Sequence, residues 1–249
     1  MQIKFLQKKP FFIFVIENFL SDFEYKILNE NFPYPDKEKF GVCEGGKYTL
    51  LNSDDLYKSL HQDGNQCIKI LEEKFDSNFF LDLEKKVKKE IIISRFSKPL
   101  NLFSLIRKTK IVKKTTNKNF LQKLFYSNYK YTLGFSYMFK DSYIHPHSDS
   151  QSKLLSLMLY FPTKKLENSS IGTTFYNTKI KNFKNKQPNL FNDEFSSFFK
   201  ENFQETLTLP FKKKDLYCFI KSDLSWHSVK KLDIPDDEIR KSININLNI

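Results

Sequence analysis

The second half of the chain has the pattern of a series of short β-strands, and this pattern limits the fold more than any other feature. In Ser242–Ile249, isoleucine or leucine at each odd position alternates with asparagine at positions 244, 246 and 248. Such alternation is typical of a strand with one buried face. Five further segments are also expected to be strands: Tyr131–Phe139, Leu154–Phe161, Thr173–Asn177, Glu205–Pro210 and Leu216–Ile220. Short strands so close in sequence favour an antiparallel sandwich or barrel.

The first half has mainly helical patterns. Ser21 to Glu24 forms a capping box that predicts a helix to about Asn31, ended by Pro33. Leu56–Phe75 and Leu81–Ile91 have helical spacing, whereas Gly41 to Gly46 is expected to be a loop. We predict a mainly β (α+β) fold in one domain, residues 1–249. Its N-terminal part, 1–128, would be mostly helical and would buttress a β core at 129–249.

Apolar runs and cysteines exclude several protein classes. The longest strongly apolar run, Phe11–Ile16, ends at Glu17 after six residues, and a membrane-spanning helix needs about 20. The N-terminus also lacks a secretory signal, so we expect a soluble cytoplasmic protein with no membrane partner. Cys43, Cys67 and Cys218 are far apart, which disfavours disulfides and a thiolate zinc site. Cys218 lies in an apolar run and is expected to be a buried, inert thiol.

The net charge of +12 raises the question of a nucleic-acid partner. The chain holds 38 lysines but only three arginines, and it has no alanine. This bias is typical of AT-rich codons, and a nucleic-acid reader would be expected to use more arginine. Lysine-rich Arg107–Lys123 is interpreted as a loop or an exposed helix. The composition therefore disfavours nucleic acid as a partner without excluding it.

Histidines of the β half form the candidate site. His147 and Asp149 are two residues apart, so on an extended chain both side chains point to the same face. A second histidine, His227, follows a distant strand. Two imidazoles and one carboxylate form the triad that holds Fe(II) and leaves positions open for other ligands. A His-x-Asp pair alone is weak, because most such pairs are solvated turns.

Neighbouring residues refine this hypothesis. Arg240 and Ser242 begin the last strand and share one face, whereas Lys241 points to the other face. Arg240 is therefore preferred over Lys241 as the cation that would bind a dicarboxylate. His145 is two residues before His147, so on an extended chain it lies on the same face and could be the ligand instead, although Pro146 disturbs the strand. We expect His145 near the mouth of the site, with a merely structural role as the alternative. Trp226 is interpreted as a packing residue and His61 as exposed.

The order of these motifs resembles the 2-oxoglutarate/Fe(II)-dependent oxygenases, especially their prolyl-hydroxylase-like branch. The resemblance is carried by His147-x-Asp149, the strand after Gly172, His227 and Arg240-x-Ser242, and more loosely by Ile16–Ser21. It implies a double-stranded β-helix (jelly-roll) core. It also implies oxidation of a substrate coupled to decarboxylation of 2-oxoglutarate to succinate, with Fe(II), 2-oxoglutarate and O2 as cofactors and ascorbate as a further candidate.

The resemblance also implies residue roles. His147, Asp149 and His227 correspond to the catalytic iron ligands, Arg240 and Ser242 to the residues on the distal carboxylate of 2-oxoglutarate, and Tyr137 to an aromatic lining that pocket. Halogenating relatives lack the carboxylate that Asp149 supplies, so hydroxylation is favoured.

The predicted function is a dioxygenase that hydroxylates a small or medium polar metabolite, free or attached to a carrier. The alternatives are an oxygenase acting on protein side chains or nucleic-acid bases, a non-catalytic metal-binding β-barrel, and a zinc hydrolase with the same ligands. Three segments are expected to shape the mouth of the barrel: Gly41–Lys47, Ile106–Asn119 and Thr178–Phe203. The sequence carries no signal for an oligomeric state.

Overall fold

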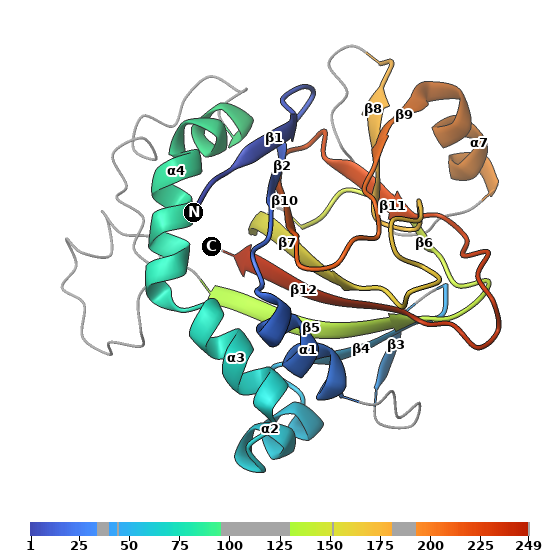
Figure 1. Cartoon of the computed structure of the whole chain (residues 1–249). Coiled ribbons are helices and arrows are strands. Elements are labelled where there is room, and N and C mark those ends of the chain that lie inside the picture. Colours follow the sequence, from blue (N-terminus) through green and yellow to red (C-terminus); the bar gives the residue numbers. More distant parts are fainter. Residues whose placement is uncertain (34–39, 44, 96–129, 151, 181–192, 249) are drawn as a thin grey trace.

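Two antiparallel sheets form the centre of the molecule in the computed structural model, which describes residues 1–33, 40–43, 45–95, 130–150, 152–180 and 193–248 (Figure 1). The larger sheet has the order β1-β2-β10-β7-β12-β5-β4-β3 and the smaller one β6-β11-β8-β9. The strands of the larger sheet are β1 (Lys4–Gln7), β2 (Ile13–Ile16), β3 (Gly41–Cys43), β4 (Lys47–Leu51), β5 (Lys130–Met138), β7 (Lys153–Phe161), β10 (Leu216–Ile220) and β12 (Arg240–Asn248). Those of the smaller sheet are β6 (Ile144–His147), β8 (Thr174–Thr178), β9 (Phe203–Thr208) and β11 (Trp226–Val229).

From β5 to β12 the chain passes back and forth between the two sheets. Strands β5, β7, β10 and β12 are neighbours in the larger sheet, and the strands between them in sequence form the smaller sheet. This arrangement is a double-sheet jelly roll, as predicted. β12 lies at its centre and pairs over most of its length with β5 on one side and β7 on the other.

Helices cover the outer face of the larger sheet (Figure 1). They are α1 (Asp22–Glu30), α2 (Asp55–Gln62), α3 (Gln66–Lys74) and α4 (Ser77–Arg95). The predicted capping box is present at α1, where Ser21 Oγ accepts from Glu24 N at 3.2 Å and Glu24 Oε2 accepts from Ser21 N at 2.8 Å. One core lies between these helices and the sheet, and it includes Leu28, Leu71 and Ile243. A second core, which includes Met158, Phe175 and Val229, lies between the two sheets.

The first half contains more strand than its sequence predicts. Gly41 to Gly46 was expected to be a loop, yet β3 and β4 form a hairpin whose second strand pairs with β5. β3 is exposed and has no alternating pattern, so only its pairing along the sheet makes it a strand. The segment Leu56–Phe75 forms two helices instead of one, and Gly64, with φ of +78°, lies between them. The short helix expected within Thr178–Phe203 is α7 (Asp193–Asn202).

Other expectations concern the helices, the cysteines and two basic segments. No helix in the described part of the chain is both long and apolar enough to cross a bilayer. Cys67 and Cys218 are buried, Cys43 is exposed, and all three are free. Burial raises the pKa of the Cys218 thiol well above its usual value, as expected of an inert cysteine. The basic segments 107–123 and 106–119 lie outside the described residues.

Candidate metal centre

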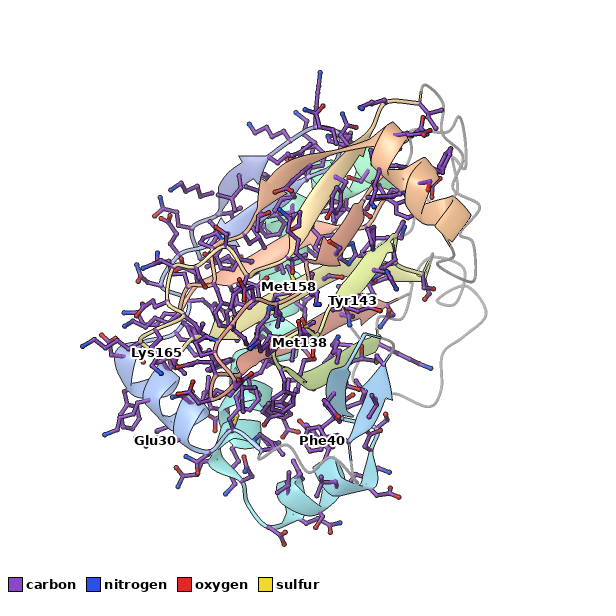
Figure 2. All side chains as sticks on the ribbon, turned by 90° about the vertical axis from the view of Figure 1, so that its right-hand side faces the viewer. Glu30, Phe40, Met138, Tyr143, Met158 and Lys165 are labelled. Atoms are coloured by element: carbon purple, nitrogen blue, oxygen red, sulfur yellow. The ribbon has the colours of Figure 1, made fainter. Side chains whose placement is uncertain are left out.

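A cavity of about 280 Å³ lies between the two sheets. His147, Asp149 and His227 line it from the smaller sheet and the loop after β6, and Arg240 and Ser242 line it from β12. Figure 2 shows Met138 and Met158 in the interior of the molecule; Met158 lines the cavity and Met138 lies beside Arg240. The cavity therefore brings together five of the six residues to which the sequence assigned a role.

Antiparallel pairing brings the two histidines together. His147 at the end of β6 is opposite His227 on β11, with ring centroids 4.4 Å apart. Asp149 lies between them, with Oδ1 3.7 Å from His147 Nε2 and Oδ2 3.8 Å from His227 Nε2. One donor atom from each of the three residues lies within 4.8 Å of the other two. This spacing suits three side chains that surround a single ion.

The backbone selects the tautomer of both histidines. His147 Nδ1 is 2.8 Å from the carbonyl of His145, and His227 Nδ1 is 2.9 Å from that of Ser225. Because a carbonyl only accepts hydrogen bonds, Nδ1 carries the proton in each ring. The lone pair of each Nε2 then faces Asp149 and is available to a metal. Backbone contacts of this kind orient histidine ligands in metal sites.

Asp149 is a buried carboxylate with donors on both oxygens; its side chain is 8% exposed. Lys153 Nζ lies 2.7 Å from Oδ1, and Ser156 Oγ lies 3.2 Å from Oδ2. Burial acts to raise the pKa of Asp149, but neighbouring positive charge, including the Lys153 ammonium 2.7 Å away, holds it well below its usual value. The carboxylate is therefore ionised at neutral pH.

His227 is neutral at the same pH. Burial, with a further contribution from His147, lowers its pKa to about 3. An ionised carboxylate and a neutral imidazole are the states in which these side chains bind metals. The residues present therefore fit a divalent transition metal held by two nitrogens and one oxygen.

Two supporting contacts were not foreseen from the sequence. Ser156 Oγ bridges Asp149 Oδ2 and Asn246 Oδ1, the latter at 3.1 Å, and so ties the carboxylate to β12. Lys221 is buried after β10 and donates to Ser148 Oγ at 2.6 Å, and Ser148 is the residue between His147 and Asp149. The one available signal was the position of Ser156 as a serine within the otherwise apolar run 154–161.

Arg240 is a buried cation at the opposite wall of the cavity, 3% exposed. Its Nε donates to the carbonyl of Ile171 at 2.7 Å, and its guanidinium lies over the rings of Tyr160 and Phe211 at 5.2 and 5.5 Å. In the described part of the chain, no carboxylate pairs with it, and burial lowers its pKa.

Strand parity places Arg240 and Ser242 on the inner face of β12, as predicted. Lys241 points to the outer face, where its Nζ donates to Asn29 Oδ1 at 2.6 Å. The inner face continues with Asn244 and Asn246, which also line the cavity. The asparagine face of β12 is therefore a polar wall of the cavity.

Tyr137 lies outside the cavity, and the expectation that it lines the cosubstrate pocket is wrong. It is opposite Lys241 in the pairing of β5 with β12, so its side chain points to the outer face. There it is buried against Phe32 and Phe40, with ring centroids 5.3 and 5.5 Å away. Spacing from His147 could not decide which face of β5 Tyr137 occupies.

The remaining candidates have packing or backbone roles. The ring of His145 packs against Tyr143 with centroids 4.7 Å apart and is not among the residues that line the cavity, and its carbonyl lies 2.8 Å from His147 Nδ1. Trp226 packs with Phe199 and Phe203 beside the smaller sheet, as expected. His61 is exposed and lies 3.0 Å from Glu72.

Comparison with known proteins gives likenesses among solved structures only: no family model and no curated protein matches the chain. A prolyl-4-hydroxylase from Pseudomonas putida is similar with a TM-score of 0.46 and 8% identity, over 95% of this chain and 91% of that one. A viral collagen prolyl hydroxylase from Paramecium Bursaria Chlorella virus-1, in complex with 2-oxoglutarate, has a TM-score of 0.44 and 11% identity over 95% and 94%. A non-heme alpha-ketoglutarate-dependent carbocyclase from nogalamycin biosynthesis has a TM-score of 0.46 and 10% identity, over 95% of this chain and 79% of that one. At such low identities, what this chain does has to be inferred from its own residues.

Proposed function

We propose that the protein is an Fe(II)- and 2-oxoglutarate-dependent dioxygenase that hydroxylates a small or medium polar metabolite, free or attached to a carrier. The observation that carries this proposal is the pairing of two features in one cavity. One is a His-Asp-His set ready for a divalent metal, and the other is a buried guanidinium with no carboxylate partner among the described residues.

The three protein ligands suit iron that must also bind other molecules. His147, Asp149 and His227 offer one donor atom each, which leaves positions of an octahedral ion open. When bound, Fe(II) with 2-oxoglutarate supplies the oxidative decarboxylation that is coupled to oxidation of a C–H bond. The chain itself orients the ligands through the carbonyls of His145 and Ser225 and through Ser156.

Arg240 supports a dicarboxylate as the cosubstrate. A buried charge without a partner costs several kcal/mol, and an incoming carboxylate removes that cost. The guanidinium is planar and can bind a carboxylate through two hydrogen bonds. Its contacts with Ile171, Tyr160 and Phe211 fix the guanidinium before any ligand binds. Ser242, on the same face of β12, adds a hydroxyl beside it.

The walls of the cavity support a small substrate. Leu157, Met158, Phe219 and Val229 contribute apolar surface beside the polar residues of β12, a combination typical of small-molecule sites. A volume of about 280 Å³ suits a small molecule or the reacting group of a larger one.

The direct test is formation of succinate from 2-oxoglutarate by the purified protein with Fe(II) and oxygen, measured across pools of small metabolites. We expect slow succinate formation without substrate and faster formation with the right pool. Asp149→Ala should abolish both, whereas Lys85→Met, on an exposed position of α4, should leave both unchanged. Succinate formation that persists in Asp149→Ala would contradict the proposal.

A further inference from the structure

Lys47 is a cation in the cavity wall to which the proposed reaction gives no role. It begins β4 and is half-buried, and its side chain lines the same cavity as Arg240 and the candidate ligands. Lys47 and Arg240 are both opposite Met138 on β5, one from each neighbouring strand. Residues directly opposite one another share a face of the sheet, so all three point inward. In the described part of the chain, no carboxylate pairs with Lys47.

The two cations serve different parts of the cavity. Strands separated by one other strand lie about 10 Å apart. The guanidinium of Arg240 lies over Tyr160 on β7 and its Nη1 is 3.7 Å from Met138 Sδ on β5, so it stays close to β12, with β5 between it and β4. Arg240 and Lys47 therefore approach the cavity from strands on opposite sides of β5.

The charge balance of the cavity leaves room for a second anion. Among the lining residues that the structure describes, Lys47, Lys153 and Arg240 are cationic and only Asp149 is anionic. The charge of a divalent metal and that of a dicarboxylate cosubstrate cancel one another. Their binding therefore leaves the excess of cationic side chains unchanged. Burial lowers the pKa of Lys47, and repulsion by Arg240 and Lys153 lowers it further, whereas Cys43 and Asp149 act in the opposite direction.

The hairpin that carries Lys47 is fixed to the strand that carries His147. Gly45 accepts at its carbonyl from Tyr143 N at 2.8 Å, and Gly46 accepts from Ser142 Oγ at 3.1 Å, just before β6 begins. Gly45 has φ of +79°, and a Cβ there would lie 2.2 Å from the carbonyl oxygen of Tyr143. This close fit holds Lys47 at a set position relative to the candidate metal ligands.

We infer that the substrate carries an anionic oxygen group, a carboxylate or a phosphate ester, and that Lys47 binds this group while Arg240 binds the cosubstrate. The inference rests on the proposed function. It assigns the substrate to the acidic metabolites and makes Lys47 the residue that positions it. A lysine suits either group, because its ammonium acts as a point charge.

The test uses small probes, because the substrate itself is not needed. The protein is loaded with Mn²⁺ and 2-oxoglutarate without oxygen, and the binding of both is measured first. Acetate, methyl phosphate and the uncharged acetamide are then titrated in turn, and relaxation of their methyl protons by the bound Mn²⁺ is recorded. We expect saturable relaxation for acetate, methyl phosphate or both, and none above background for acetamide.

Variants assign the effect to Lys47. Lys47→Met should weaken probe binding by about tenfold, since a charge partner is lost, and should leave the affinity for 2-oxoglutarate unchanged. Lys47→Arg should retain probe binding, and Lys85→Met on α4 serves as the matched surface control. A response to acetate alone identifies a carboxylate as the preferred group, and a response to methyl phosphate alone identifies a phosphate ester.

Three results would overturn the inference. Probe binding that is unchanged in Lys47→Met would mean that the anion binds the metal or another cation. A loss of 2-oxoglutarate affinity in Lys47→Met would assign Lys47 to the cosubstrate. Failure of the unmodified protein to bind Mn²⁺ and 2-oxoglutarate would refute the proposed function, and the inference with it, before any probe is added.

Discussion

Replacing Arg240 by alanine tests whether the cation at the rear of the cavity binds the cosubstrate. Arg240 is 3% exposed, and a carboxylate bound to its guanidinium would also be withdrawn from water. Truncating one partner of such a buried charge pair costs roughly 2–5 kcal/mol. That cost corresponds to a loss of affinity for 2-oxoglutarate of roughly 30- to 5000-fold. The metal ligands do not contact Arg240, so the affinity for Mn²⁺ should not change.

Calorimetric titration of 2-oxoglutarate into the Mn²⁺-loaded protein measures this loss. Lys241→Ala is the matched control, because Lys241 is the next residue on the same strand and contacts Asn29 on the outer face. Arg240→Lys should recover only part of the affinity, since an ammonium cannot form the paired hydrogen bonds of a guanidinium. An unchanged affinity for 2-oxoglutarate in Arg240→Ala would refute the reasoning. Another cation would then bind the distal carboxylate, and Lys47 would be the first to test.

Three further predictions concern metal binding and stability. Ser156→Ala removes the hydroxyl that holds Asp149 Oδ2 and should weaken Mn²⁺ binding by about tenfold or more in a calorimetric titration; equal affinity would show that Lys153 alone orients the carboxylate. The pKa of His227 falls from 6.5 to about 3 on folding, so between these values the unfolded chain binds a proton that the folded chain does not. The metal-free protein should therefore lose stability as the pH falls below 6.5, by up to about 1.4 kcal/mol per pH unit. Denaturant titrations should show a smaller loss in His227→Gln and an unaltered one in His61→Gln. Ser21→Ala removes the capping box of α1 and should lower the free energy of unfolding by about 1 kcal/mol, whereas an unchanged unfolding midpoint would mean that packing alone defines the start of the helix.

Local patterns predicted most of the elements, and they identified three side chains whose donor atoms lie within 4.8 Å of one another in the structure. The alternation in Ser242–Ile249 and the apolar run of Leu154–Phe161 correspond to the strands β12 and β7, and the Ser21–Glu24 box corresponds to the start of α1. Parity along a strand also separated Arg240 from Lys241 correctly. These successes share one cause, which is that a backbone period of two or 3.6 residues acts within a single element.

Expectations that depended on a neighbouring element were less secure. The hairpin of β3 and β4 has too few apolar residues to be predicted, and it exists because β5 offers a free edge. Tyr137 was placed by its distance in sequence from His147, but the face it occupies follows from its pairing with Lys241. The contacts of Ser156 with Asn246 and of Lys221 with Ser148 join segments 90 and 73 residues apart.

The sequence by itself determined strands such as β7 and β12, the start of α1 and the shared face of Arg240 and Ser242, because spacing along one backbone decides which side chains share a face. The tertiary structure decided what each face meets. The asparagines of β12 have the pattern of a solvated surface, yet the second sheet covers them and turns them into a wall of the cavity. Polarity in a sequence indicates that a side chain needs hydrogen-bonding partners. Whether those partners are water, a ligand or another strand depends on how the two sheets pack.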